Sequence, residues 1–201
     1  MGGNAIKIAE NLPAKYYGGV IEEIKSELQG EFVFKTLGSS GKRHDVYGDI
    51  DIGIYHRDSK SHEHTLKRLT ELLDKKEVRL MSGLGIISVS WEFEKNRFCQ
   101  VDFMVCSNED ELRWYDFIYW SPDLRSGLIK YKGLYRTELL RAICANVKVN
   151  VQEDSFYKLT LAKDGLKWQQ KVKNKKGKFM INRAEDSLVT TSPRFATMTI
   201  L

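Results

Sequence analysis

The alternation of acidic and apolar residues from Asp49 to Ile54 limits the fold of this chain more than any other feature. The string DIDIGI predicts a β-strand that turns its isoleucines to one face and Asp49 and Asp51 to the other. The isoleucine face needs a hydrophobic core against it. The aspartate face needs solvent or a counter-charge, because neighbouring carboxylates repel each other and burying an unpaired one is costly. The sequence therefore predicts a sheet with a core on one face and a polar site on the other.

A second strand of the same kind is predicted at 98–106, with the sequence FCQVDFMVC. Its valines and phenylalanine alternate with Gln100, Asp102 and Met104, so Asp102 also projects away from the apolar face. No Arg or Lys is interleaved among the aspartates of the two strands. A divalent cation would offset their charge, and hard carboxylate oxygens favour Mg²⁺ or Mn²⁺. The alternative is that these acids are solvated at a strand end or on an edge strand.

A turn of small residues, Gly38-Ser39-Ser40-Gly41, follows a predicted strand and precedes Lys42 and Arg43. Small residues let backbone N–H groups approach phosphate oxygens, and serine hydroxyls add donors. The pattern GxxxxGK[ST] is absent, so this is not a turn of the Walker A type. The alternative interpretation is a plain connecting turn with solvated charges after it.

The string LGSSGKRHDVYGDIDIGIY, followed later by QVDFMV, resembles the signature of the DNA polymerase beta-like nucleotidyltransferase superfamily. That signature is an apolar residue with Gly-Ser, a short spacer, Asp-x-Asp in an apolar strand, and a third carboxylate on a later strand. The resemblance covers residues 32–105, where all three parts occur in order. It implies a palm-like core, in which a mixed, mainly antiparallel sheet is flanked by helices.

The resemblance also implies a reaction, the transfer of a nucleoside monophosphate from a nucleoside triphosphate, such as ATP, to a hydroxyl with release of pyrophosphate. The residues with a catalytic and metal-binding role, with Mg²⁺ or Mn²⁺ as cofactor, would be Asp49, Asp51 and Asp102. The residues that would bind the triphosphate are Gly38, Ser39, Ser40, Lys42 and Arg43. The acceptor stays open between a nucleic-acid 3′ end, a small molecule and a protein, as in toxin- or antitoxin-like transferases. A further alternative is a non-catalytic module that binds nucleotide or RNA.

Hydrophobic periodicity divides the chain into two parts. Residues 1–108 are expected to form the core that carries the aspartates, with helices at 13–30 and 61–76 and a strand at 85–94. Residues 109–201 are expected to form two helices, at 109–120 and 134–147, followed by a basic meander of three strand-like runs. The predicted class is therefore α+β, with a helical and basic β-rich C-terminal extension. The sequence leaves open whether its end packs as a strand or belongs to a longer protein.

Positive charge is concentrated between residues 158 and 183, where nine Lys and Arg residues face one acid, Asp164. The whole chain has a net charge of +5. A localised basic segment suggests a polyanionic partner such as nucleic acid or a nucleoside triphosphate. The alternative is a solvated, lysine-rich hairpin.

Several other classes of protein do not fit the sequence. Cys99, Cys106 and Cys144 form no CxxC pair, so a disulfide framework or zinc ribbon is not expected and a reducing, cytoplasmic setting is favoured. No apolar run has the length of a membrane helix, so no membrane partner is expected. His62 and His64 stand two apart near a helix start, which predicts surface positions on different faces. Oligomeric state cannot be inferred.

Overall fold

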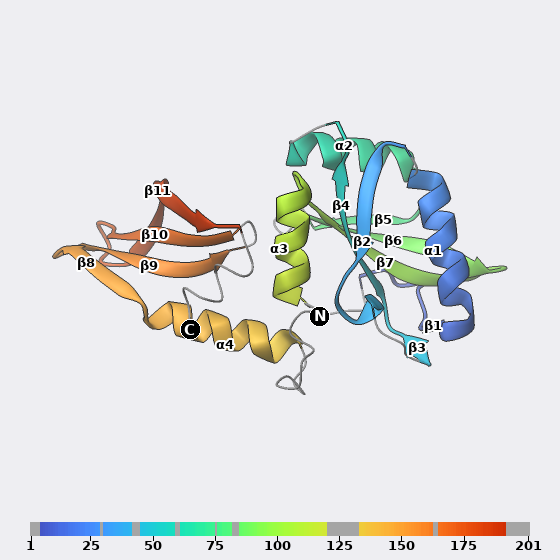
Figure 1. Cartoon of the computed structure of the whole chain (residues 1–201), viewed down its shortest axis with the longest axis horizontal. Coiled ribbons are helices and arrows are strands. Elements are labelled where there is room, and N and C mark those ends of the chain that lie inside the picture. Colours follow the sequence, from blue (N-terminus) through green and yellow to red (C-terminus); the bar gives the residue numbers. More distant parts are fainter. Residues whose placement is uncertain are drawn as a thin grey trace. The chain divides into compact units, whose positions relative to one another are not determined.

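The computed structural model describes residues 5–28, 30–41, 45–58, 61–74, 76–81, 85–119, 133–162 and 165–191. It divides into an N-terminal unit, Met1–Leu112, and a C-terminal unit, Arg113–Leu201, whereas the sequence placed a boundary after residue 108. The described part contains helices and sheets in which antiparallel pairs predominate, which confirms the predicted α+β class (Figure 1).

A five-stranded mixed sheet forms the centre of the N-terminal unit. Its strands, in spatial order, are β2 (Phe32–Thr36), β4 (Ile50–His56), β7 (Arg97–Val105), β6 (Ile86–Glu94) and β5 (Val78–Met81). The pair β4–β7 is parallel and the other three pairs are antiparallel. A separate two-stranded ribbon joins β1 (Leu12–Pro13) to β3 (Val46–Tyr47). The expected mixed sheet is therefore present, and β5 is a strand that the sequence did not predict.

Two helices, α1 (Ala14–Leu28) and α2 (His62–Leu72), cover one face of this sheet (Figure 1). Both bury residues at helical spacing against the sheet: Val20, Ile24 and Leu28 from α1, and Leu69 from α2, lie in one core cluster with the isoleucines of β4. Ser61 caps α2 by accepting a hydrogen bond from the backbone N–H of His64 at 3.3 Å. The predicted isoleucine face is thus the core face, and Ile50, Ile52 and Ile54 are fully buried.

The C-terminal unit contains a four-stranded antiparallel sheet and a helix. In spatial order the strands are β11 (Phe179–Thr190), β10 (Gly165–Lys173), β9 (Ser155–Ala162) and β8 (Lys148–Gln152). The helix α4 (Gly133–Asn146) buries Leu140 and Cys144 against Leu159, Leu161 and Leu166 of the sheet. Trp114 of α3 (Glu109–Tyr119) belongs to the same cluster, and its indole N–H donates to the carbonyl of Ala162 at 2.8 Å.

The strands of the basic region differ from the predicted meander in two ways. β8 adds a fourth strand before the three expected runs, and β11 continues to Thr190, beyond the basic segment that ends at residue 183. Both extra segments are largely exposed. In β8, Val149 and Val151 alternate with polar residues, a strand signal that the sequence analysis did not use, whereas residues 184–190 of β11 show no such alternation. No helix in the described segments is long and apolar enough to cross a membrane.

Candidate metal and phosphate site

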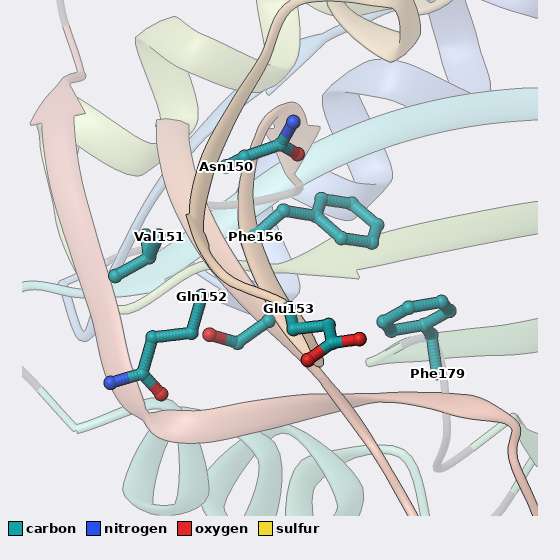
Figure 2. A pocket seen from close by; sticks show the side chains of 7 residues that line it. Asn150, Val151, Gln152, Glu153, Phe156 and Phe179 are labelled. Atoms are coloured by element: carbon teal, nitrogen blue, oxygen red, sulfur yellow. The ribbon is translucent and has the colours of Figure 1, made fainter.

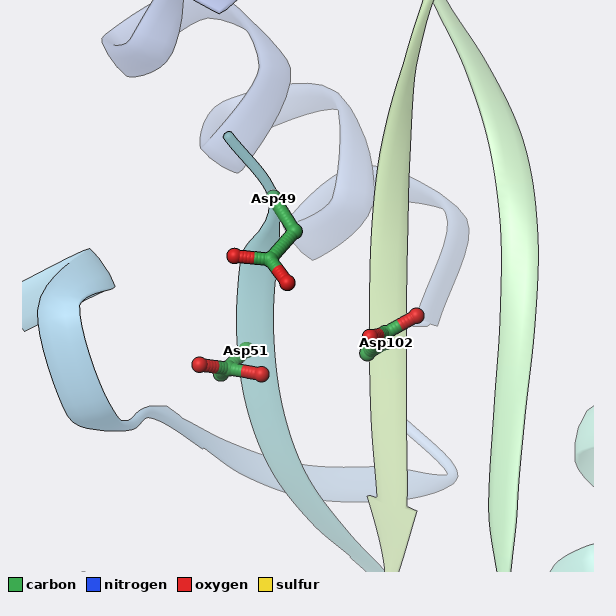
Figure 3. A group of neighbouring side chains, drawn as sticks. All are labelled: Asp49, Asp51 and Asp102. Carbon is green, nitrogen blue, oxygen red and sulfur yellow. The ribbon is translucent and has the colours of Figure 1, made fainter. Parts of the chain in front are cut away.

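Three carboxylates converge on the sheet face opposite the core (Figure 3). Asp51 of β4 and Asp102 of β7 are cross-strand partners in the parallel pair, and Asp49 directly precedes β4. One carboxylate oxygen from each residue lies within 4.8 Å of the other two. The pairing of β4 with β7 therefore brings together all three aspartates that the sequence singled out, although the two strands are about fifty residues apart in the chain.

The electrostatics of this group are unfavourable without a counter-charge. Burial first, and then the charges of Asp49 and Asp102, together raise the pKa of Asp51 from 3.8 to about 7. Burial and then the charge of Asp102 raise the pKa of Asp49 in the same direction. Burial also raises the pKa of Asp102, and the neighbouring Ser88 side chain and the hydrogen bonds from Gln100 partly offset that effect. The site is therefore built to hold negative charge that the apo protein stabilises poorly.

Gln100 fixes the orientation of Asp102. Its side-chain NH₂ donates to both carboxylate oxygens of Asp102, at 2.9 and 3.0 Å. Its side-chain carbonyl accepts from the backbone N–H groups of Ala5 and Ile6, at 3.0 and 3.1 Å. Because the carbonyl is engaged by backbone donors, the NH₂ group is left to face the carboxylate. Sequence reasoning placed Gln100 on the aspartate face but assigned it no role, and its two-residue spacing from Asp102 was the signal that could have found it.

The Gly-Ser turn lies directly against β4. It forms a short 3-10 helix, η1 (Gly38–Gly41), in which the hydroxyl oxygen of Ser40 accepts from the backbone N–H of Asp51 at 2.8 Å. Gly38 has φ +57°, and a Cβ atom there would come within 2.9 Å of Oδ2 of Asp51. Glycine is therefore required by both conformation and space. The carbonyl of Ser40 accepts from the hydroxyl of Tyr17 in α1, a contact that sequence reasoning did not foresee.

Gly53 lies on the same face of β4 as Asp49 and Asp51, and apolar side chains cover it. A Cβ atom at this position would lie 2.3 Å from Cδ1 of Leu112 and 3.0 Å from Cδ1 of Leu37. The start of α3 and the residue before η1 therefore pack directly on the strand backbone, beside the carboxylates. Because this packing covers β4 at Gly53, the polar site is confined to the N-terminal end of the strand, at Asp49 and Asp51.

The remaining predicted phosphate contacts are only partly described. Ser39 lies in η1, but its side chain is outside the described part, and Lys42 and Arg43 fall outside the described residues altogether. Gly38 and Ser40 are brought to Asp51 as expected. Ser40 is 2% exposed and its oxygen is engaged by Asp51 N–H, so its main observed role is to hold the turn on β4.

The residues present fit a hard divalent cation. In the described part of the chain no ion pair includes Asp49, Asp51 or Asp102, so no side chain there balances their charge. All the converging donors are carboxylate oxygens, which are the ligands that Mg²⁺ and Mn²⁺ prefer. His62 and His64 do not belong to the group.

Comparison with models of known protein families finds no match to this chain, and comparison with curated proteins finds none either.

Proposed function

We propose that the chain is a metal-dependent nucleotidyltransferase whose N-terminal unit is a palm-like core. The observation that carries this proposal is the convergence of Asp49, Asp51 and Asp102 on one sheet face, beside a turn in which Gly38 lies against Asp51. The reaction moves a nucleoside monophosphate from a nucleoside triphosphate, ATP among them, to a hydroxyl and releases pyrophosphate.

The three aspartates would hold Mg²⁺ or Mn²⁺. A bound divalent cation supplies Lewis-acid chemistry, which acidifies an acceptor hydroxyl and neutralises charge on the triphosphate. The side-chain NH₂ of Gln100 donates to both carboxylate oxygens of Asp102, which fixes the orientation of this carboxylate toward the cation. The η1 turn, held on β4 through Ser40, would present backbone N–H groups to the phosphates, and Lys42 or Arg43 would add positive charge.

The acceptor is open between a nucleic-acid 3′ end, a small molecule and a protein. A basic C-terminal unit favours nucleic acid, because residues 158–183 carry nine Lys and Arg residues against one acid. A non-catalytic nucleotide- or RNA-binding module is the second candidate. The complete set of three aspartates favours the enzyme, since a module that had lost catalysis would usually have lost one of them.

The test measures transfer of label from α-³²P nucleoside triphosphates to DNA, tRNA, protein and small-hydroxyl acceptors in the presence of Mg²⁺ or Mn²⁺. Asp51→Asn keeps the shape of the side chain and removes its charge, and should lower transfer at least about 1,000-fold. Asp45→Asn is the matched control, because Asp45 is exposed and lies outside the carboxylate group. Equal transfer by wild type and Asp51→Asn, or none by the wild type to any acceptor, would contradict the proposal.

A second readout needs no acceptor. Mg²⁺ or Mn²⁺ together with a non-hydrolysable triphosphate should raise the melting temperature of the wild type, because ligands that bind only the folded state stabilise it. Asp49→Asn/Asp51→Asn should lose that increase, whereas Asp45→Asn should keep it. An increase of equal size in all three proteins would place the cation elsewhere.

A further inference from the structure

The sheet of the C-terminal unit has one face that α4 does not cover. Leu159, Leu161 and Leu166 point to the α4 side and are buried. Side chains alternate along a strand and cross-strand partners share a face, so the register defines the opposite, outer face. The members of this outer face are Lys148, Asn150, Phe156, Lys158, Thr160, Ala162, Lys167, Gln169, Lys171, Lys173, Phe179, Ile181 and Leu188.

Two phenylalanines form an aromatic cluster on the outer face. The rings of Phe156 and Phe179 meet edge to face, with centroids 5.0 Å apart, and Phe179 is 48% exposed. Both side chains line an open cavity of about 410 Å³ together with Asn150, Gln152 and Glu153 (Figure 2). An exposed aromatic wall with amide and carboxylate groups around it matches a nucleobase, which offers a flat ring and a polar edge.

Lysines surround this cluster. The ammonium group of Lys148 lies 5.5 Å from the ring centroid of Phe156, and Lys158 and Lys171 stand on the neighbouring positions of β9 and β10. Burial and the charge of Lys158 both lower the pKa of Lys171, which Asp186 opposes. Lys173 is already paired with Asp154 at 3.1 Å. Lys158 and Lys171 therefore repel each other, and a bound polyanion would relieve that repulsion.

The charge of the whole unit agrees with this placement. Residues 113–201 contain 17 basic and eight acidic residues, a net charge of +9, whereas residues 1–112 carry 15 basic and 19 acidic residues, a net charge of −4. Spaced lysines track a phosphate backbone, and exposed aromatic rings stack on unpaired bases. Bases in a duplex are already stacked, so this combination favours a single strand.

We propose that the outer face of the β8–β11 sheet binds single-stranded nucleic acid, with one base held against Phe156 and Phe179 and the backbone phosphates held by Lys148, Lys158 and Lys171. The assignment does not rest on the proposed transferase activity, because it uses no residue of the carboxylate site. If that activity is present, the same face would bring a nucleic-acid acceptor to the protein.

The experiment measures binding of the full chain to a fluorescent 12-nucleotide single strand by anisotropy, without divalent cation or nucleotide, from 50 to 300 mM salt. Binding should weaken steadily with salt, and a duplex of the same sequence should bind more weakly than the single strand. Phe179→Ala should weaken single-strand binding by about 5- to 100-fold. Met180→Ala is the matched control, since Met180 is the next residue, is 58% exposed and lies on the opposite face by register.

Charge is tested with matched pairs of lysines. Lys158→Gln/Lys171→Gln should reduce the slope of log affinity against log salt by about 1.4, the value for two lost phosphate contacts on a single strand. Lys175→Gln/Lys176→Gln removes the same charge from the exposed turn between β10 and β11 and should leave the slope within error. Circular dichroism of each variant checks that the sheet is intact.

Several outcomes would overturn the proposal. These are an absence of binding at 50 mM salt, equal affinity for duplex and single strand, equal losses in Phe179→Ala and Met180→Ala, or equal slopes for the two lysine pairs. Binding to vesicles with 30% anionic lipid as tight as to the oligonucleotide would instead make the face a membrane surface and would also overturn it. Asp51→Asn should bind the strand as the wild type does, so failure of transfer and failure of this proposal remain distinguishable.

Discussion

The two units of this chain differ in the sign of their net charge and in how closely their charged side chains lie together. The N-terminal unit is acidic overall and brings three carboxylates within 4.8 Å of one another on a half-buried sheet face. The C-terminal unit is basic overall and spreads its lysines over strands that are mostly half-exposed or exposed. Like charges therefore meet at one fixed point in the first unit and are dispersed near solvent in the second.

This difference indicates what each unit is suited to do. Chemistry on a phosphate needs charged groups held in one geometry, and their mutual repulsion is tolerated because the surrounding strands are rigid. Binding of a flexible polyanion needs many weak contacts, each screened by solvent and salt. The first arrangement costs stability in the apo protein and the second costs little, so changes in the two units should have effects of different size.

The largest effect on stability is expected from Asp51. Its pKa rises from 3.8 to about 7 on folding, so between these values the folded state holds a proton that the unfolded state has lost. The free energy of unfolding of the N-terminal unit should therefore fall as pH rises through this range, by about 1–3 kcal/mol for this group. Asp51→Asn should flatten the decrease and raise the melting temperature at pH 8 in EDTA. Thermal unfolding across pH 4–8 measures both quantities.

Asp45→Asn serves as the control for that experiment, and Mg²⁺ with a triphosphate should restore stability to the wild type and to Asp45→Asn but not to Asp51→Asn. The prediction fails if the free energy of unfolding of the wild type, compared with that of Asp51→Asn, stays constant or increases with pH. That result would show that repulsion among the three carboxylates is small. The carboxylate site would then cost the N-terminal unit no stability, and the two units would differ only in what they bind.

A smaller effect is expected from Gly38. An alanine there would meet Asp51 at 2.9 Å and would have to adopt φ +57°, so Gly38→Ala should cost about 1–2 kcal/mol and lower transfer about 10-fold or more. Gly30 offers a matched control, because it has φ +93° but nothing within 4 Å of an added Cβ. Gly30→Ala should lower stability by about 1 kcal/mol and leave transfer unchanged. Equal losses of transfer in both variants would mean that the turn acts only through folding.

Much of the N-terminal unit could be predicted because its signals are periodic. Alternation identified β4 and β7 and assigned their faces, and helical spacing identified α1 and α2. The strand β5 was missed because it is a short edge strand whose Val78–Met81 sequence shows little burial contrast. The strand β8 carries the alternating Val149 and Val151, but it is short and exposed and directly follows the helix predicted at 134–147, so it was not assigned. Tertiary pairing, rather than local pattern, made these segments into strands.

The sequence identified which aspartates form the site, but it did not show which groups contact them. Sequence grouped Asp49 and Asp51 by spacing, but only the parallel β4–β7 register shows that Asp102 lies beside Asp51. The backbone of Ala5 and Ile6 reaches Gln100 across more than ninety residues, a pairing that no local pattern contains. Long-range hydrogen bonds of this kind decide how the carboxylates are oriented.

Tyr17 should show an effect of about 1 kcal/mol. Its hydroxyl donates to the carbonyl of Ser40, so Tyr17→Phe removes a hydrogen bond that holds the η1 turn on the sheet. The KM for the triphosphate should rise about 3- to 10-fold with little change in kcat, if the turn binds phosphate. Tyr16→Phe is the neighbouring control, because Tyr16 donates to Glu94 in an exposed hydrogen bond at 2.7 Å, away from the turn. A lower kcat with unchanged KM would instead place the turn in the chemical step.

The smallest effect is expected from Gly18 and tests whether the units unfold separately. Gly18 is exposed in the second turn of α1, and an added Cβ would meet nothing within 4 Å. Gly18→Ala should therefore stabilise the N-terminal unit by about 0.5–1 kcal/mol through the higher helix propensity of alanine. If the two units are independent, calorimetry should show one transition raised by a few degrees and a second unchanged. If a single transition moves as a whole, the acidic and basic halves fold as one cooperative body, and the stability cost of the carboxylate site is shared by both.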